Sequence, residues 1–143
     1  MKTVIFACVH NAGRSQMAEA FFNRGADPSR ARALSAGTEP AARVHSEVVE
    51  VMREAGFDLS AARPVRLTPV LARSASLLVT MGCGEACPVV PALEREDWPL
   101  RDPKDQPRTR VREIRDEIRQ RVDELLRLRG WGRASSETPV DRA

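Results

Sequence analysis

The sequence predicts an α/β domain, a doubly wound parallel sheet of about four strands with helices on both faces. Residues 3–7 and 74–82 are short apolar runs typical of buried parallel strands, and ARALSAG at 31–37 is a further strand that ends in a glycine turn. Segments with apolar residues at helical spacing separate and follow these runs. Strands that alternate with helices form parallel sheets, and 143 residues suffice for one such domain.

Four helices and a weak strand complete the predicted order. A helix over 14–24 turns Met17, Ala18, Phe21 and Phe22 inward and stops at Gly25. A second helix covers 44–55, a short one covers 68–72, and the weak fourth strand covers 97–100. The last helix, 108–130, has one apolar stripe, formed by Val111, Ile114, Ile118, Val122, Leu125 and Leu126. We place the domain at 1–130 and expect a flexible polar tail at 131–143.

Composition excludes several classes of protein. No apolar stretch is long enough to cross a membrane and no signal peptide is recognisable, so we expect a cytoplasmic protein. The net charge is only +3, the basic residues are scattered, and 21 of the 23 are arginine. Aromatic residues make up 4% of the chain and tyrosine is absent, which argues against a base-stacking surface for nucleic acid.

The chain has three cysteines, Cys8, Cys83 and Cys87. An odd number in a reducing compartment argues against a structural disulfide framework and for reactive or metal-binding thiols. A zinc site is disfavoured because the pair Cys83–Cys87 has no second ligand pair, while His10 and His45 are isolated in sequence. We therefore predict no metal site.

Cys8 stands where the first strand gives way to a loop and a helix. The predicted oxyanion-binding loop consists of Val9, His10, Asn11, Ala12, Gly13, Arg14 and Ser15. Backbone N–H groups at a helix N-terminus form a nest for anions, and Gly13 permits the tight curvature. The fork of Arg14 suits two oxygens of a tetrahedral oxyanion, and Ser15 is placed to donate to the sulfur. This surrounding favours a Cys8 thiolate that acts as a nucleophile, over a merely buried small residue.

These residues also carry a family resemblance. CVHNAGRS resembles the C-x5-R-S loop of the low-molecular-weight protein tyrosine phosphatases, and the continuation QMAEA resembles their arsenate reductase relatives. SAGTEP at 35–40, VTMGCGEACP at 79–88 and DWPLRDP at 97–103 extend the resemblance over nearly the whole chain. It implies an arsenate reductase that acts in arsenic detoxification, converting arsenate to arsenite through a Cys8–arsenic adduct.

The resemblance implies roles for the remaining site residues. Asp102, before Pro103, becomes the general acid, with Asp105 as a competitor. Cys83 and Cys87 become a relay that moves a disulfide from Cys8 outward, on a segment whose mobility comes from Gly82 and Gly84. Cys83 is the expected first attacker.

Asn11, Glu19 and Ser35 match loop-supporting positions that bind potassium in some relatives. The carboxylate expected within 62–67 is absent here, so no potassium site is predicted. A purely solvated Glu19 is the alternative to its supporting role. We expect the His10 ring to face away from the thiol.

No bound cofactor is expected, only an external thiol reductant: thioredoxin, or mycothiol or glutathione with a glutaredoxin-like carrier. The three-residue spacing between Cys83 and Cys87 is shorter than in many thioredoxin-coupled relatives, which leaves the donor open. Phosphate and sulfate should compete with arsenate, and we expect a monomer.

Two other functions stay open. The first is a phosphatase on protein tyrosine, disfavoured by the sparse aromatic residues, with weak activity on aryl phosphates allowed as a side reaction. The second is a non-catalytic arsenite-binding or sensing protein, which would need neither Arg14 nor Asp102.

Overall fold

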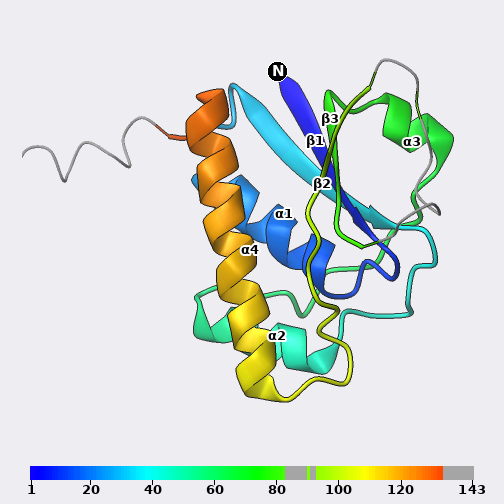
Figure 1. Ribbon diagram of the computed structural model, residues 1–143, viewed down its shortest axis with the longest axis vertical. Helices are drawn as coiled ribbons and strands as arrows, with labels where there is room; N and C mark the ends of the chain where they lie inside the picture. Colours follow the sequence, from blue (N-terminus) through cyan, green and yellow to red (C-terminus); the bar gives the residue numbers. More distant parts are fainter. Residues whose placement is uncertain (83–89, 91–92, 134–143) are drawn as a thin grey trace, which may run out of the picture.

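Four parallel strands form one sheet in the order β2-β1-β3-β4 (Figure 1). The structure is a computed structural model, and it describes residues 1–82, 90 and 93–133. The strands are β1 (Lys2–Cys8), β2 (Ala31–Gly37), β3 (Leu77–Thr80) and β4 (Glu94–Asp97). Because β1 has a neighbour on each side, its residues from Val4 to Cys8 are all buried.

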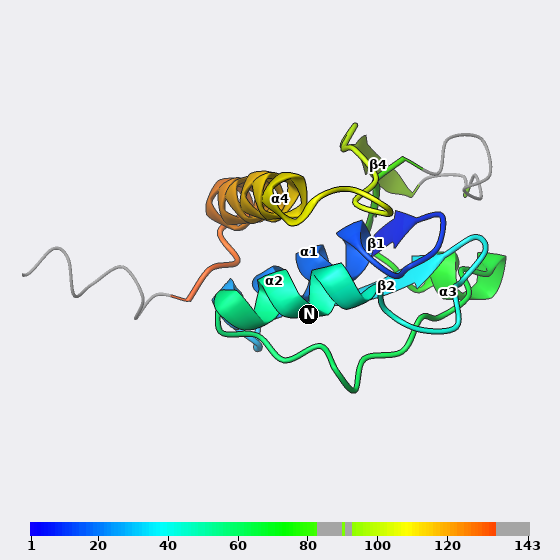
Figure 2. The ribbon, with the colours of Figure 1, turned by 90° about the horizontal axis from the view of Figure 1, so that it is seen from below.

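Helices cover both faces of the sheet, as the sequence predicts (Figure 2). They are α1 (Arg14–Gly25), α2 (Ser46–Glu54), α3 (Pro69–Arg73) and α4 (Arg108–Arg129). α1, α2 and α4 share the larger core with one face, and α3 packs on the other. No helix in the described parts of the chain is long and apolar enough to cross a membrane.

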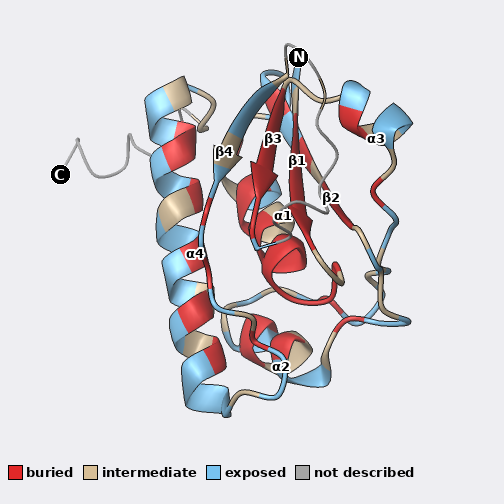
Figure 3. Cartoon of the chain, turned by 45° about the vertical axis from the view of Figure 1, so that its right-hand side comes forward, coloured by how far each residue is buried: buried red, intermediate tan, exposed pale blue. Residues whose placement is uncertain are grey.

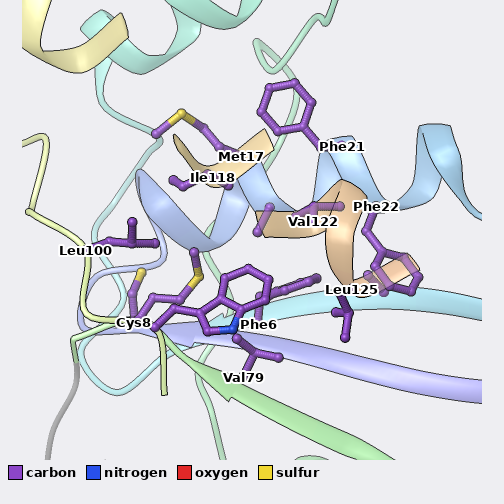
Figure 4. Close-up of a cluster of buried hydrophobic side chains, with 14 of the residues drawn as sticks. Phe6, Cys8, Met17, Phe21, Phe22, Val79, Leu100, Ile118, Val122 and Leu125 are labelled. Carbon is purple, nitrogen blue, oxygen red and sulfur yellow. The ribbon is translucent and has the colours of Figure 1, made fainter. Parts of the chain in front are cut away.

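The larger core explains the apolar spacing in the sequence. All six residues of the predicted α4 stripe are buried, and the outer side of the helix is exposed (Figure 3). Phe6 from β1 packs between Phe22 and Trp98, with ring centroids 5.9 and 5.6 Å away (Figure 4). Side chains alternate along β1, so Cys8 points to the same face as Phe6 and lies against α1.

The fourth strand is correctly predicted to exist, but its position is wrong. It spans Glu94–Asp97, not 97–100, and three of its four residues are exposed. It is the sheet's edge strand, where charged residues are tolerated and discourage pairing with other chains. The buried residues Trp98 and Leu100 follow the strand, with Pro99 between them. These apolar residues led to the prediction at 97–100, but they belong to the segment that leaves the strand.

Other boundaries move by small amounts. Cys8 is the last residue of β1, paired with Gly37, not the first residue after the strand. β3 is shorter than predicted because Ser74 still caps α3, and α2 begins after His45.

The flexible tail was predicted to begin at residue 131, which is too early. The Trp131 ring packs against Phe22 at a centroid distance of 6.2 Å, and Arg133 N–H donates to the Gly25 carbonyl over 3.0 Å. Residues 131–133 therefore belong to the folded domain, while the predicted tail at 134–143 lies outside the described residues.

Candidate active site

The loop between β1 and α1 is braced from its outer side. The Cys8 carbonyl and three carbonyls of the loop accept N–H hydrogen bonds from the segment that follows β2. The pairs are Thr38 to Cys8 at 3.2 Å, Glu39 to Val9 at 2.7 Å, Ala41 to His10 at 3.0 Å and His45 to Ala12 at 3.0 Å. Among the described residues, the backbone N–H groups from His10 to Gly13 have no acceptor. These donors stay available for an anion, as expected of a nest.

Cys8 is held by a hydroxyl at the start of α1. Its Sγ lies 2.9 Å from Ser15 Oγ, and both side chains are buried. Asn11 Nδ2 donates to the same Ser15 oxygen over 2.7 Å. A hydroxyl has one donor and two acceptor positions, so Ser15 can accept from Asn11 and still donate to the Cys8 sulfur.

Asn11 has the loop-bracing role that the sequence predicts. It is fully buried with a φ of 50°, in the left-handed region that Asn tolerates better than most residues. Its Oδ1 accepts from Val65 N over 2.8 Å and from Gln16 Nε2 over 3.1 Å. The backbone donor Val65 N–H fixes which end of the amide is oxygen, and so fixes Nδ2 toward Ser15.

Gln16 is a supporting residue that the sequence reasoning missed. Its Nε2 donates to the Asn11 carbonyl over 3.1 Å and to the Arg63 carbonyl over 3.3 Å. The side chain thus ties the loop to the segment at 62–67, which supports the site through its backbone. The sequence shows only an amide side chain in the first turn of the predicted helix, and its burial becomes visible in the structure.

Arg14 lies buried under the loop with an incomplete set of partners. Its Nη1 donates to the Leu100 carbonyl over 3.1 Å, and Nη2 lies 3.7 Å from Asp102 Oδ2. The buried Nε has no hydrogen-bond partner among the described residues. A buried donor without an acceptor is costly, so this is a group that we expect a bound oxyanion to satisfy.

Asp102 reaches the site from the segment after β4. Its side chain is 46% exposed, and its Oδ1 accepts from Lys104 N–H over 3.0 Å. A Cβ on Gly13 would lie 2.7 Å from Pro103 Cγ, so Gly13 permits the close approach of this segment to the loop. Its competitor Asp105 occupies a left-handed turn position with a φ of 59°.

Glu19 and Ser35 form a pair beside the loop. Ser35 Oγ donates to Glu19 Oε1 over 2.6 Å, and a cavity of about 250 Å³ adjoins them, lined also by Gln16 and Arg63. Burial raises the pKa of Glu19, and the Ser35 hydrogen bond opposes this in part. Glu19 is therefore not a solvated helix residue, and the contact supports the predicted bracing role.

His10 contacts the segment that follows β2. Its Nδ1 is 3.1 Å from the Glu39 carbonyl oxygen, and it lines a shallow cavity with His45 and Lys104. Burial lowers the pKa of His45, and the nearby Asp102 carboxylate opposes that shift.

Cys83 and Cys87 lie outside the described residues, as does Gly84. Gly82, directly before Cys83, is described and lies against Arg14. Cys8 is a buried free thiol. A separate cavity of about 760 Å³, lined by Phe21, Phe57 and Leu126, lies at the far end of α1. Three of its arginines, Arg24, Arg30 and Arg133, donate to backbone carbonyls, and its described lining residues include no thiol.

A thiol, a nest of amides, a buried guanidinium and a carboxyl group at one edge of a parallel sheet define an oxyanion-handling enzyme site. The family described as low molecular weight phosphotyrosine protein phosphatase matches residues 3–134, and the chain belongs to it.

Several proteins similar to this chain are described as arsenate reductases. A Halobacterium salinarum protein, provisionally described as an arsenate reductase, is 44% identical over 125 residues, 85% of this chain and 88% of the relative. A Synechocystis glutaredoxin arsenate reductase is 32% identical, covering 88% of this chain and 97% of the relative. The structure of a Corynebacterium glutamicum thioredoxin-dependent arsenate reductase superposes with a TM-score of 0.76 at 39% identity. That match covers 89% of this chain and 61% of the other.

Proposed function

We propose that the protein is an arsenate reductase, and that it acts in arsenic detoxification. The observation that carries the proposal is the buried hydrogen-bonded chain Asn11–Ser15–Cys8, which holds the thiol beside the free amides of the loop. The similarity to proteins described as arsenate reductases supports arsenate as the substrate.

The first step joins arsenic to the protein. The Cys8 thiolate attacks the arsenic atom, and an arsenic–oxygen bond breaks. Asp102 supplies the proton with which that oxygen leaves as water, and Arg14 and the loop amides hold the remaining oxygens. The distance of 3.7 Å between Arg14 Nη2 and Asp102 Oδ2 supports this assignment of roles.

The second step reduces arsenic. A Cys83 thiolate attacks Cys8 Sγ, the sulfur–arsenic bond breaks, and its electron pair stays on arsenic, which passes from the +5 to the +3 state. Arsenite leaves, and Cys8 is left in a disulfide with Cys83. Cys87 then attacks Cys83 and frees Cys8, so that the Cys83–Cys87 disulfide carries the oxidation.

An external thiol reductant closes the cycle. We favour thioredoxin, in line with the Corynebacterium glutamicum relative, and the Synechocystis relative makes a glutaredoxin-like carrier with mycothiol or glutathione the alternative. The enzyme is proposed to act as a cytoplasmic monomer. Phosphate and sulfate compete with arsenate because they share its tetrahedral shape and charge.

The reaction is tested by measuring arsenite formed from arsenate with thioredoxin, its reductase and NADPH as the only electron supply. We expect turnover that is lost in Cys8→Ser, Cys83→Ser and Cys87→Ser. Activity only with a small thiol and a glutaredoxin-like carrier would retain the reaction and change the donor.

Two outcomes would overturn the reductase assignment. The first is hydrolysis of an aryl phosphate without any arsenite from arsenate, which would make the protein a phosphatase. The second is tight stoichiometric binding of arsenite without conversion of arsenate, which would make it a sensor.

The order of the relay is tested by trapping. In Cys87→Ser, one turnover should leave a Cys8–Cys83 disulfide that mass spectrometry of peptides detects. A Cys8–Cys87 disulfide in Cys83→Ser, with arsenite formed at the normal rate, would contradict this order.

A further inference from the structure

Gly82 lies directly against the guanidinium of Arg14. A Cβ built on Gly82 would be 2.4 Å from Nη1 and 3.3 Å from Cζ of Arg14. Real Cβ atoms do not approach other atoms this closely, so any other residue at 82 would displace the guanidinium. We propose that Gly82 is a positioning residue that sets where Arg14 binds the oxyanion.

The guanidinium of Arg14 is held by polar contacts and by a steric contact with Gly82. Nη1 donates to the Leu100 carbonyl, and Nη2 faces Asp102. These two contacts come from the segment after β4. Gly82 comes from the exit of β3 and bounds the same Nη1 by its backbone alone. Arg14 is therefore held between two neighbouring segments, and its buried Nε has no hydrogen-bond partner among the described residues.

Backbone conformation alone does not account for this glycine. Gly56, Gly82 and Gly130 all have positive φ, at 91°, 102° and 72°. A Cβ at Gly56 or Gly130 would meet nothing within 4 Å, whereas at Gly82 it would meet Arg14. The three positions share the strain of a left-handed residue, and the contact with the guanidinium distinguishes Gly82 from the other two.

The consequence of a substitution is selective. The atoms that a Cβ would displace are the end of a flexible side chain, so the fold can accommodate the change by moving Arg14. That movement changes the donors presented to the anion, because Arg binds tetrahedral oxyanions through a fixed fork. Anion affinity should therefore suffer more than folding stability.

This role rests on the proposed function, in which Arg14 binds arsenate. The test measures the Kd of phosphate and of sulfate, the competing anions that the thiols do not reduce, by calorimetry on the reduced protein. Gly82→Ala is compared with Gly56→Ala and Gly130→Ala as matched controls for backbone strain. Unfolding midpoints in urea are recorded for all four proteins.

We expect Gly82→Ala to raise both Kd values by about tenfold or more, and the controls to stay within about twofold of the parent protein. All three variants should lose similar stability. In an Arg14→Lys background, which lacks the guanidinium, Gly82→Ala should have little further effect on Kd. Gly82→Asn, whose side chain tolerates positive φ, should weaken binding at least as much as Gly82→Ala.

Unchanged affinity in Gly82→Ala and Gly82→Asn would overturn the positioning role, and so would an equal loss in the Arg14→Lys background. Either result leaves the proposed function standing if the parent protein still forms arsenite. A parent protein that binds neither anion and forms no arsenite would instead overturn the proposed function, and the positioning role with it.

Discussion

Residues 8–16, which include the oxyanion-binding loop, and helix α4 both bury many side chains, but the buried side chains make different kinds of contact. In α4, six aliphatic side chains repeat at helical spacing and fill one core. In the loop, polar side chains have particular partners: Ser15 pairs with Cys8, Asn11 with Ser15 and Val65, and Arg14 with Leu100.

The difference separates stability from chemistry. Burial of an apolar α4 side chain stabilises the fold if the side chain fits the volume of the core, because the hydrophobic effect is not directional. The loop contacts are directional, and they fix a sulfur, a guanidinium and a row of amides around one point. Substitutions in α4 should therefore lower folding stability, and substitutions in the loop should lower activity.

The largest effect on stability is expected from Ile118→Ala in α4. Ile118 is fully buried, and its truncation leaves a cavity under α1. We expect the free energy of unfolding to fall by about 2–5 kcal/mol, with kcat for arsenite formation unchanged in the folded protein. Urea denaturation measures the change, and Gln120→Ala on the exposed side of α4 is the control. A large loss of kcat in stably folded Ile118→Ala would erase the contrast between the two regions.

Asp102→Asn should have the largest effect among the acid candidates. The amide cannot supply the proton that the leaving oxygen needs, so formation of the arsenic adduct should slow by about a hundredfold. Asp105→Asn, three residues further on, is the control and should react at nearly the normal rate. Rapid-quench measurement of arsenite decides between them, and a larger loss in Asp105→Asn would reassign the acid.

Ser15→Ala should have a smaller effect. It removes the hydroxyl that donates to Cys8 and leaves Asn11 Nδ2 without its acceptor. The rate of Cys8 alkylation by iodoacetamide at neutral pH should fall by about tenfold, since one hydrogen bond to a charged group is lost. Ser46→Ala, at the exposed start of α2, should alkylate at the rate of the parent protein. An unchanged rate in Ser15→Ala would show that the loop amides and Arg14 suffice to maintain the thiolate.

Glu19→Gln should have the smallest effect, visible as a dependence on pH. Burial raises the pKa of Glu19 in the folded protein above its ordinary value of 4.5. The folded state then binds the proton more tightly than the unfolded state, so this group costs stability as pH rises through 4.5 and beyond. Glu19→Gln removes that cost and should gain stability relative to the parent protein between pH 4 and pH 7. Urea midpoints that differ equally at both pH values would refute the assignment to Glu19.

Much of the molecule was predictable because its signals are local. The apolar periodicity predicts α1 and α4, and the order Cys8, Gly13, Arg14, Ser15 predicts the nest. Asn11 was correctly predicted as a loop brace because a tight nest needs internal hydrogen bonds.

The remaining features depend on distant partners. Gln16 binds the Arg63 carbonyl, 47 residues away, and no pattern in the sequence announces such a contact. The position of the edge strand β4 was predicted wrongly because its charged residues are typical of a loop. The packing of Trp131 on Phe22 is invisible for the same reason, since a polar segment around one aromatic ring resembles a flexible tail.

In the proposed reaction, Cys8 forms the arsenic adduct and the chain's own thiols reduce it. The most direct test is a single turnover of pre-reduced protein with arsenate, without air and without external thiol. We expect about one arsenite per chain together with one internal disulfide, and no arsenite from Cys8→Ser. Arsenite from Cys8→Ser, or no arsenite from the parent protein until an external thiol is added, would contradict the proposed reaction.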